Sequence, residues 1–285
     1  MEDLAGRSCV VTGAASGIGR GLALRAAAEG MRVLAADVDE AGLEETATAV
    51  QRAGAECGTL RVDVSRRADL ERLADTAWRA FGGVDLLFNN AGVLVPGSGW
   101  ERSEDDWAWQ LGVNLWGVIH GVSVFLPRMI ERGEPAHVVN TASVGGLLVG
   151  PFLTPYIVSK HAVVALSEAL HQELRLRRAP VRISCLCPGA VRTGIARSER
   201  VRPAERGDPA ALVSSLEQRF AEGLDQGLQG GMSPEEVAAA TFERVRAGRF
   251  WILPDPSFQE AVEQRLRSIL SGEDPAVPGA LDPDA

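Results

Sequence analysis

The sequence predicts an α/β protein built on one doubly wound, seven-stranded parallel sheet with helices on both faces. Short apolar stretches alternate with longer helical patterns along most of the chain. The apolar stretches are continuous rather than alternating, as expected for strands that are covered on both faces. A glycine-rich turn follows the first of these stretches and precedes the first helical pattern, as at the first strand-to-helix turn of such sheets.

The elements follow in order. We expect strands at 8–12, 32–36, 58–62, 84–88, 137–141, 182–186 and 250–253. We expect helices at 17–29, 40–53, 67–80, 103–132 and 156–177. A further helix should begin at "SPEE", with Ser233 as its N-cap and Glu236 closing a capping box.

The chain is expected to form one domain over residues 1–271. Between 194 and 232 the pattern loosens for longer than a plain connection inside a domain requires. We therefore predict that this stretch, called the lid segment below, covers a bound substrate. Residues 272–285 are rich in Pro, Gly, Ala and Asp and are expected to be a disordered tail.

Composition narrows the class of protein. The net charge is −9 and no basic stripe exists, so no nucleic-acid partner is expected. The N-terminus lacks the basic and apolar regions of a secretory signal, and no apolar run approaches the length of a membrane span. We therefore expect a cytoplasmic protein without a membrane partner. Cys185 and Cys187 fall on one face of a strand and are expected to be buried thiols, and no pattern indicates a metal site.

The glycine turn indicates a dinucleotide site. Gly13, Gly17 and Gly19 would bring backbone N–H groups at a helix N-terminus close to a pyrophosphate. Asp37 ends the second strand, where a carboxylate can bind the adenosine ribose hydroxyls and repel a 2′-phosphate. Ser16 and Val38 stand where basic residues could neutralise that phosphate. The sequence therefore predicts NAD in preference to NADP.

A second signal comes from scarce residues. The chain has one Tyr, one Lys and four Asn, beside 28 Arg. Tyr156 and Lys160 are four apart on a predicted helix and so share a face. A phenol titrates near pH 10, and a neighbouring ammonium lowers its pKa toward the range useful for proton transfer. The planar fork of Arg would not serve in the same place, which explains why Lys is kept here.

Six short motifs appear in order: "TGAASGIG" at 12–19, "NNAG" at 89–92, "VN" at 113–114, "NTAS" at 140–143, "YIVSK" at 156–160 and "PGAVRT" at 188–193. Together they resemble the short-chain dehydrogenase/reductase family over about residues 7–195, in its single-domain form with a Rossmann fold. The resemblance implies hydride transfer between a nicotinamide cofactor and a substrate carbon.

The resemblance also implies roles for four catalytic residues. Tyr156 would be the general acid/base at the substrate oxygen, and Ser143 would hydrogen-bond that oxygen. Lys160 would hold the nicotinamide ribose and tune Tyr156, while Asn114 would position a water that relays protons. Asn89, Asn140 and Ser159 are expected to be structural, Ser159 on the helix surface.

For the cofactor, the resemblance implies that Asn90, Ala91 and Gly92 pass the adenosine side. Asp63 would bind adenine, while Val191 and Thr193 would hold the carboxamide. The complete expected cofactor set is Gly13, Ser16, Gly17, Ile18, Gly19, Asp37, Asp63, Val64, Asn90, Ala91, Gly92, Tyr156, Lys160, Pro188, Gly189, Val191 and Thr193.

The flanks of the expected catalytic residues are apolar, and no Arg or Lys lies between 143 and 159. A hydrophobic secondary alcohol or ketone is therefore the expected substrate. The helices at 103–132 and 156–177 have large apolar faces, and family members commonly pair through them, so a homodimer or homotetramer is expected. Three alternatives stay open: a ketoreductase of a polyketide or acyl intermediate, a sugar-nucleotide epimerase, and a non-catalytic NAD-binding regulator.

Overall fold

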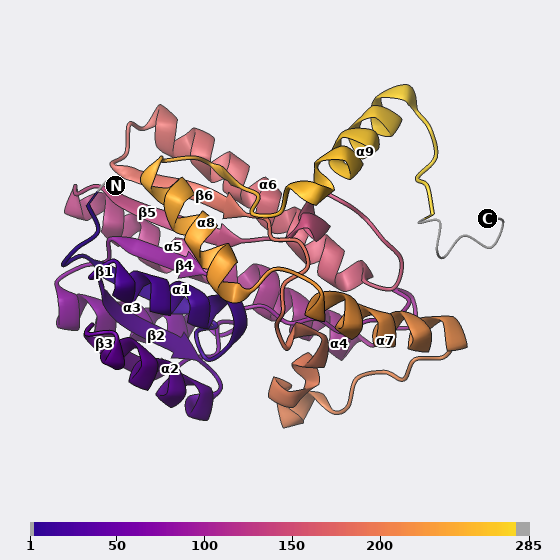
Figure 1. Cartoon of the computed structure of the whole chain (residues 1–285), viewed down its shortest axis with the longest axis horizontal. Helices are drawn as coiled ribbons and strands as arrows, with labels where there is room; N and C mark the ends of the chain where they lie inside the picture. The colour runs from indigo at the N-terminus through magenta and orange to yellow at the C-terminus, as the bar shows by residue number, and fades with distance from the viewer. Residues whose placement is uncertain (1–2, 278–285) are drawn as a thin grey trace.

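The sheet is the frame of the molecule (Figure 1). The structure is a computed structural model that describes residues 3–277. Its strands are β1 (Ser8–Thr12), β2 (Arg32–Asp37), β3 (Cys57–Arg61), β4 (Leu86–Asn89), β5 (Ala136–Thr141), β6 (Val181–Leu186) and β7 (Trp251–Ile252). They form one parallel sheet in the order β3-β2-β1-β4-β5-β6-β7, which confirms the predicted fold class. The strand order reverses between β1 and β4, where open α/β sheets bind their ligands.

Helices cover both faces of this sheet. One core lies under α1 (Gly17–Ala28), α2 (Glu40–Arg52) and α8 (Pro234–Arg246). The other lies under α3 (Arg67–Phe81), α5 (Gly117–Arg132) and α6 (Thr154–Leu176). Val10 and Val11, adjacent on β1, belong to opposite cores and are both fully buried. Both faces of the strand therefore require apolar residues, which explains the continuous apolar stretches.

The helix expected at 103–132 is interrupted. It consists of α4 (Glu104–Leu111), a π-helical turn at Gly112–Trp116, and α5. The hydrophobic periodicity does not reveal this turn, which carries Asn114. The combined helix also contains an 18-residue window of mean hydropathy 1.3, apolar enough to cross a membrane, so the expectation of no such stretch was too strong. Half of that window is buried within the protein, where the same composition serves the core.

The C-terminal part departs most from the expected elements. The lid segment contains two short 3₁₀ turns, Ile195–Val201 and Ala204–Arg206, and then α7 (Ser215–Gln229). The two ends of the segment lie close together, because the N–H of Arg192, two residues before it, donates to the Met232 carbonyl at 2.9 Å. The Ser233 capping box forms as predicted at the start of α8.

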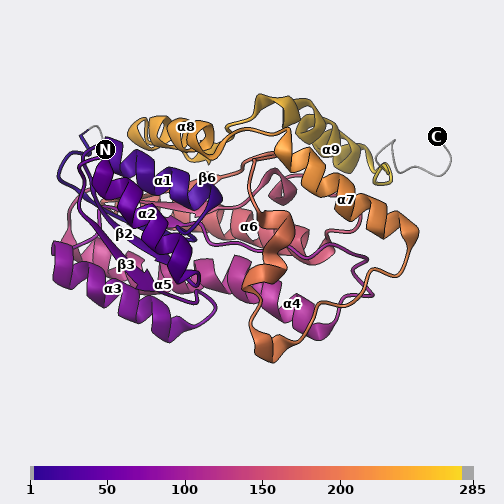
Figure 2. The same ribbon diagram turned by 60° about the horizontal axis from the view of Figure 1, so that its bottom comes forward.

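Beyond α8, β7 is only two residues long, whereas four were expected. A last helix that was not expected, α9 (Gln259–Ser271), projects from the body (Figure 1, Figure 2). Of the tail expected at 272–285, the residues after 277 lie outside the described part.

Candidate active site

The glycine turn lies at the centre of the sheet, between β1 and α1. Gly13 and Gly17 have φ of +69° and +51°, in the left-handed region that side chains disfavour. A Cβ on Gly19 would lie 1.9 Å from the Gly13 carbonyl oxygen, so the close turn excludes any larger residue there. The side chain of Ser16, the N-cap of α1, makes no capping hydrogen bond. The first N–H groups of α1 therefore lack a side-chain cap, as a phosphate site requires.

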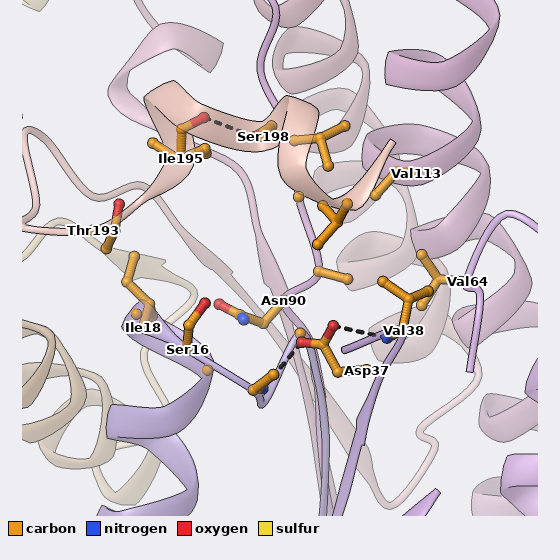
Figure 3. Close-up of a pocket in the computed structure, with 18 of the residues that line it drawn as sticks. Ser16, Ile18, Asp37, Val38, Val64, Asn90, Val113, Thr193, Ile195 and Ser198 are labelled. Atoms are coloured by element: carbon orange, nitrogen blue, oxygen red, sulfur yellow. Dashed lines mark hydrogen bonds between the residues drawn. The ribbon is translucent and has the colours of Figure 1, made fainter. Parts of the chain in front are cut away.

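Asp37 stands at the end of β2 beside this turn (Figure 3). Its carboxylate accepts hydrogen bonds from the N–H groups of Ala15 at 3.0 Å and of Val38 at 2.7 Å. Burial raises the pKa of Asp37, and these hydrogen bonds oppose the rise. The neighbouring Asp39 caps α2 by accepting from Gly42, so Asp37 is not needed as a helix cap.

The loop after β4 packs directly on the glycine turn. The amide of Asn90 donates to the Thr12 carbonyl at 3.0 Å, and a Cβ on Gly13 would lie 2.8 Å from the Ala91 Cα. The "NNAG" and "TGAASGIG" motifs therefore form two sides of one cleft. On the other edge, Asp63 accepts from the Ser65 hydroxyl at 2.6 Å while also lining the cleft.

Asn114 connects the π-helical turn to this cleft wall and to α6. Its Oδ1 accepts from the Val93 N–H at 2.8 Å, and its Nδ2 donates to the Val93 carbonyl and to Ser159 Oγ at 3.1 Å. Ser159 in turn donates to the Tyr156 carbonyl at 2.6 Å. Ser159 is therefore buried, not on the helix surface as expected, because it joins Asn114 to the turn that carries Tyr156.

Tyr156 and Lys160 lie on the same face of α6, with Lys160 Nζ 5.6 Å from the centroid of the Tyr156 ring. The ammonium donates to the Thr141 carbonyl at 3.0 Å, and burial lowers the pKa of Lys160 to about 8. Burial raises the pKa of Tyr156, and a hydrogen bond with Ser143 opposes that rise. The net shift of the Tyr156 pKa is therefore upward, opposite to the expected direction, because burial is its largest cause.

The remaining asparagines and cysteines are internal supports. Asn89 donates to Asn140 Oδ1 at 2.9 Å across β4 and β5, and Asn140 donates to Ser167 on α6 at 3.0 Å. The sulfur atoms of Cys185 and Cys187 are buried 3.7 Å apart as free thiols, which confirms that expectation. Within residues 3–277, no group of three or more His, Cys, Asp or Glu side chains is placed to hold a metal ion.

The cleft brings together most of the expected cofactor set. The expected residues on its wall are Gly13, Ser16, Gly17, Ile18, Gly19, Asp37, Asp63, Val64, Asn90, Ala91, Gly92, Tyr156, Lys160, Pro188 and Thr193. Two expected residues face elsewhere: Gly189 packs against Phe258, and Val191 is buried and pairs with Met232. Asn114 and Ser143 are not among the residues that line this cleft; Asn114 accepts from the Val93 N–H at 2.8 Å and Ser143 accepts from the Gly145 N–H at 3.0 Å.

The lid segment supplies cleft residues that the motifs did not indicate. Gly194, Ile195, Ser198, Arg200, Val201 and Pro203 all line the cleft. Ile195 and Ser198 lie across it from Ser16 and Asn90 (Figure 3). Ser198 is held there by accepting from the Leu94 N–H at 3.1 Å. No short sequence motif indicates these individual residues. The prediction that the lid segment covers a bound substrate indicated only the region in which they lie.

Comparison with known proteins gives the same class. A model described as "short chain dehydrogenase" matches residues 7–203. A crystal structure of a short chain dehydrogenase/reductase from Burkholderia phymatum in complex with NAD is 44% identical, with a TM-score of 0.94 over 98% of this chain and 99% of that one. The 1-deoxy-11-beta-hydroxypentalenate dehydrogenase of Streptomyces avermitilis is 38% identical over 92% of this chain and 89% of its own length. The 3beta-hydroxysteroid dehydrogenase 1 of Eggerthella lenta is 33% identical over 84% of this chain and 86% of its own length.

The parallel sheet, the glycine cleft and these matches define an oxidoreductase that acts on alcohol or ketone groups with NAD(P). The chain belongs to the short-chain dehydrogenase/reductase family.

Proposed function

We propose that the protein interconverts a hydrophobic secondary alcohol and its ketone with NAD, using Tyr156, Lys160, Ser143 and Asn114 as its catalytic residues. The observation that carries this proposal is the placement of Tyr156 and Lys160 on the wall of the glycine cleft. A nicotinamide cofactor fits this cleft, because the glycine turn lines it and the first N–H groups of α1 lack a side-chain cap there.

The bound cofactor would supply the hydride acceptor or donor. Tyr156 would take the proton of the substrate hydroxyl, and Ser143 would hold the same oxygen by a hydrogen bond. Lys160, anchored on the Thr141 carbonyl, would bind a ribose hydroxyl and place its charge beside the phenol. Asn114, fixed by Val93 and Ser159, would hold a water that connects the site to solvent.

We assign the apolar part of the substrate to a groove along α7, whose lining supports the hydrophobic class. Leu216, Phe220, Leu224 and Leu228 of α7 line a groove against Ala190, with Arg219 as its one charged member. Phe220 also contacts Phe152, with ring centroids 5.4 Å apart, just before α6 begins. Two relatives named above are dehydrogenases of hydroxylated compounds.

Asp37 supports NAD over NADP, because its half-buried carboxylate on the cleft wall would lie against a 2′-phosphate. The NAD named in the Burkholderia phymatum structure agrees with this choice. We further propose that residues 1–271 act as one catalytic unit with 194–232 as its lid, in the cytoplasm. The alternative function, a ketoreductase of a polyketide or acyl intermediate, differs from this proposal mainly in the substrate. The presence of both Tyr156 and Lys160 disfavours the other alternative, a regulator that binds NAD without turnover.

The proposal predicts NAD reduction by the purified protein with at least some members of a panel of alicyclic and aromatic secondary alcohols. The same panel with NADP should give a kcat/KM at least about tenfold lower, because of the carboxylate of Asp37. A panel of carrier-bound or thioester ketones with NADPH tests the ketoreductase alternative. Faster turnover of that second panel would replace the present proposal.

Self-association should also be measurable. Trp116 of the π-helical turn and Val158 of α6 are large apolar side chains that are 52% and 44% exposed in one chain. We propose that these helices pair between copies in a homodimer or homotetramer. Light scattering should give a mass of two or four times 30.3 kDa. A mass of one chain at micromolar concentration would contradict this.

A further inference from the structure

The arginines of the lid segment are unequally paired. Four of them lie between residues 195 and 206, in the two 3₁₀ turns and the short link between them. Three have a carboxylate partner: Arg197 with Asp225 at 2.9 Å, Arg202 with Asp106 at 2.8 Å, and Arg206 with Asp105 at 3.5 Å. Arg200 has no carboxylate within 4.0 Å among residues 3–277. The positive charge of Arg200 can therefore interact with solvent or with an anionic ligand, although the protein as a whole has a net charge of −9.

The guanidinium of Arg200 lies at the mouth of the glycine cleft. It donates to the Gly194 carbonyl at 3.0 Å and to Ser16 Oγ at 3.5 Å. A Cβ on Gly17 would lie 3.0 Å from the methyl group of Thr193, so Thr193 packs on the glycine turn next to Arg200. Arg200 therefore spans the N-terminus of α1, from Ser16 on one side to Gly194 on the other.

The helix start beside Arg200 has no acidic residue of its own. The first turn of α1 contains no Asp or Glu, and Ser16 does not cap it. Helix N-termini in proteins commonly have an acidic residue or a capping side chain, because either stabilises the unpaired N–H groups. Arg200, which has no carboxylate partner, thus lies beside the start of α1, which has no acidic side chain. Both lie at the part of the cleft assigned to the phosphates.

We propose that Arg200 is a phosphate-binding residue of the cofactor site, closing over the pyrophosphate from the lid side. This inference relies on the proposed function for the identity of the ligand. The phosphate oxygens would accept charge-assisted hydrogen bonds from the guanidinium, opposite the backbone N–H groups of α1. The expected cofactor set had no residue of this kind, because it was confined to the motifs before residue 194.

Buried contacts on both sides of Arg200 hold it in position. Ser198 accepts from the Leu94 N–H, and Arg202 pairs with Asp106 where both side chains are nearly inaccessible. Farther along, Arg102 donates to the carbonyl groups of Ala210 and Ala211 at 2.6 and 2.8 Å. The backbone that carries Arg200 is thus fixed before ligand binds, which reduces the entropy lost on binding.

The test is the affinity of the full-length protein for NADH, ADP-ribose, adenosine and NADPH, each measured without substrate. Arg200→Met should weaken NADH and ADP-ribose binding about tenfold and NADPH equally, because it removes a charged hydrogen-bond donor to the pyrophosphate. Adenosine, which carries no phosphate, should bind as it does to the wild type. Arg197→Met is the matched control, since it removes an exposed arginine from the same 3₁₀ turn, and should leave all four affinities unchanged.

Unchanged NADH and ADP-ribose affinities in Arg200→Met would overturn the inference. If only NADPH bound more weakly, Arg200 would be assigned to the 2′-phosphate, and the inference that it binds the pyrophosphate would be overturned. Weaker adenosine binding together with a lower melting temperature would mean that Arg200 only supports the fold. If the wild type bound none of the ligands, the cofactor assignment itself would fail. Failure of the alcohol panel with tight NADH binding would leave the role of Arg200 intact.

Discussion

Tyr156→Phe is expected to lower kcat for alcohol oxidation about 10³-fold while leaving the affinity for NADH within twofold of the wild type. General acid/base groups contribute roughly 10²- to 10⁴-fold, and the substitution removes only the phenolic oxygen, which as the phenolate would accept the proton. The ring remains to fill its place on α6, so the fold should be kept. Steady-state rates and NADH titrations on the same preparation measure both parts.

The raised pKa of Tyr156 makes this test informative. Burial of the phenol opposes its ionisation, and the net shift of its pKa is upward although Ser143 hydrogen-bonds to it. If Tyr156 is the proton acceptor, positive charge close to the phenolate must offset this effect during the reaction. A Tyr156→Phe variant that keeps more than a tenth of the wild-type kcat would show that another group takes the proton.

The sheet and the front of the cleft could be predicted because each depends on local sequence. A buried parallel strand needs continuous apolar residues, and Gly13, Gly17 and Gly19 are required by positive φ angles or by close backbone contact. Scarcity also singled out Tyr156 and Lys160, since the chain uses Arg wherever Lys is not needed.

The rest depends on contacts between distant residues. The position of Ser159 follows from a hydrogen bond to Asn114, which is 45 residues away in the chain. The lid-side wall of the cleft follows from the buried pair of Arg202 and Asp106, which no short motif records. The π-helical turn at Gly112–Trp116 leaves the hydrophobic pattern of the helix almost unchanged, so periodicity could not show it.

Lys160→Arg is expected to be nearly as damaging as the loss of Tyr156, with kcat/KM for NAD lowered about 10²-fold or more. Lys160 is 2% exposed, and its ammonium donates to the Thr141 carbonyl at 3.0 Å. A Cβ on Gly92 would lie 3.5 Å from Nζ, so the pocket closes around a small head group. A guanidinium is wider and planar, and would displace either Gly92 or the phenol.

Comparison with Lys160→Met separates charge from shape. Both variants should lose activity to a similar extent, and both should bind NADH more weakly, if a compact donor to the ribose is what the site requires. The measurement is kcat/KM for NAD together with the NADH dissociation constant, with Arg197→Met as a control for a lost surface charge. Near-normal activity in Lys160→Arg would mean that any cation suffices beside Tyr156, and the single lysine among 28 arginines would then have no chemical explanation.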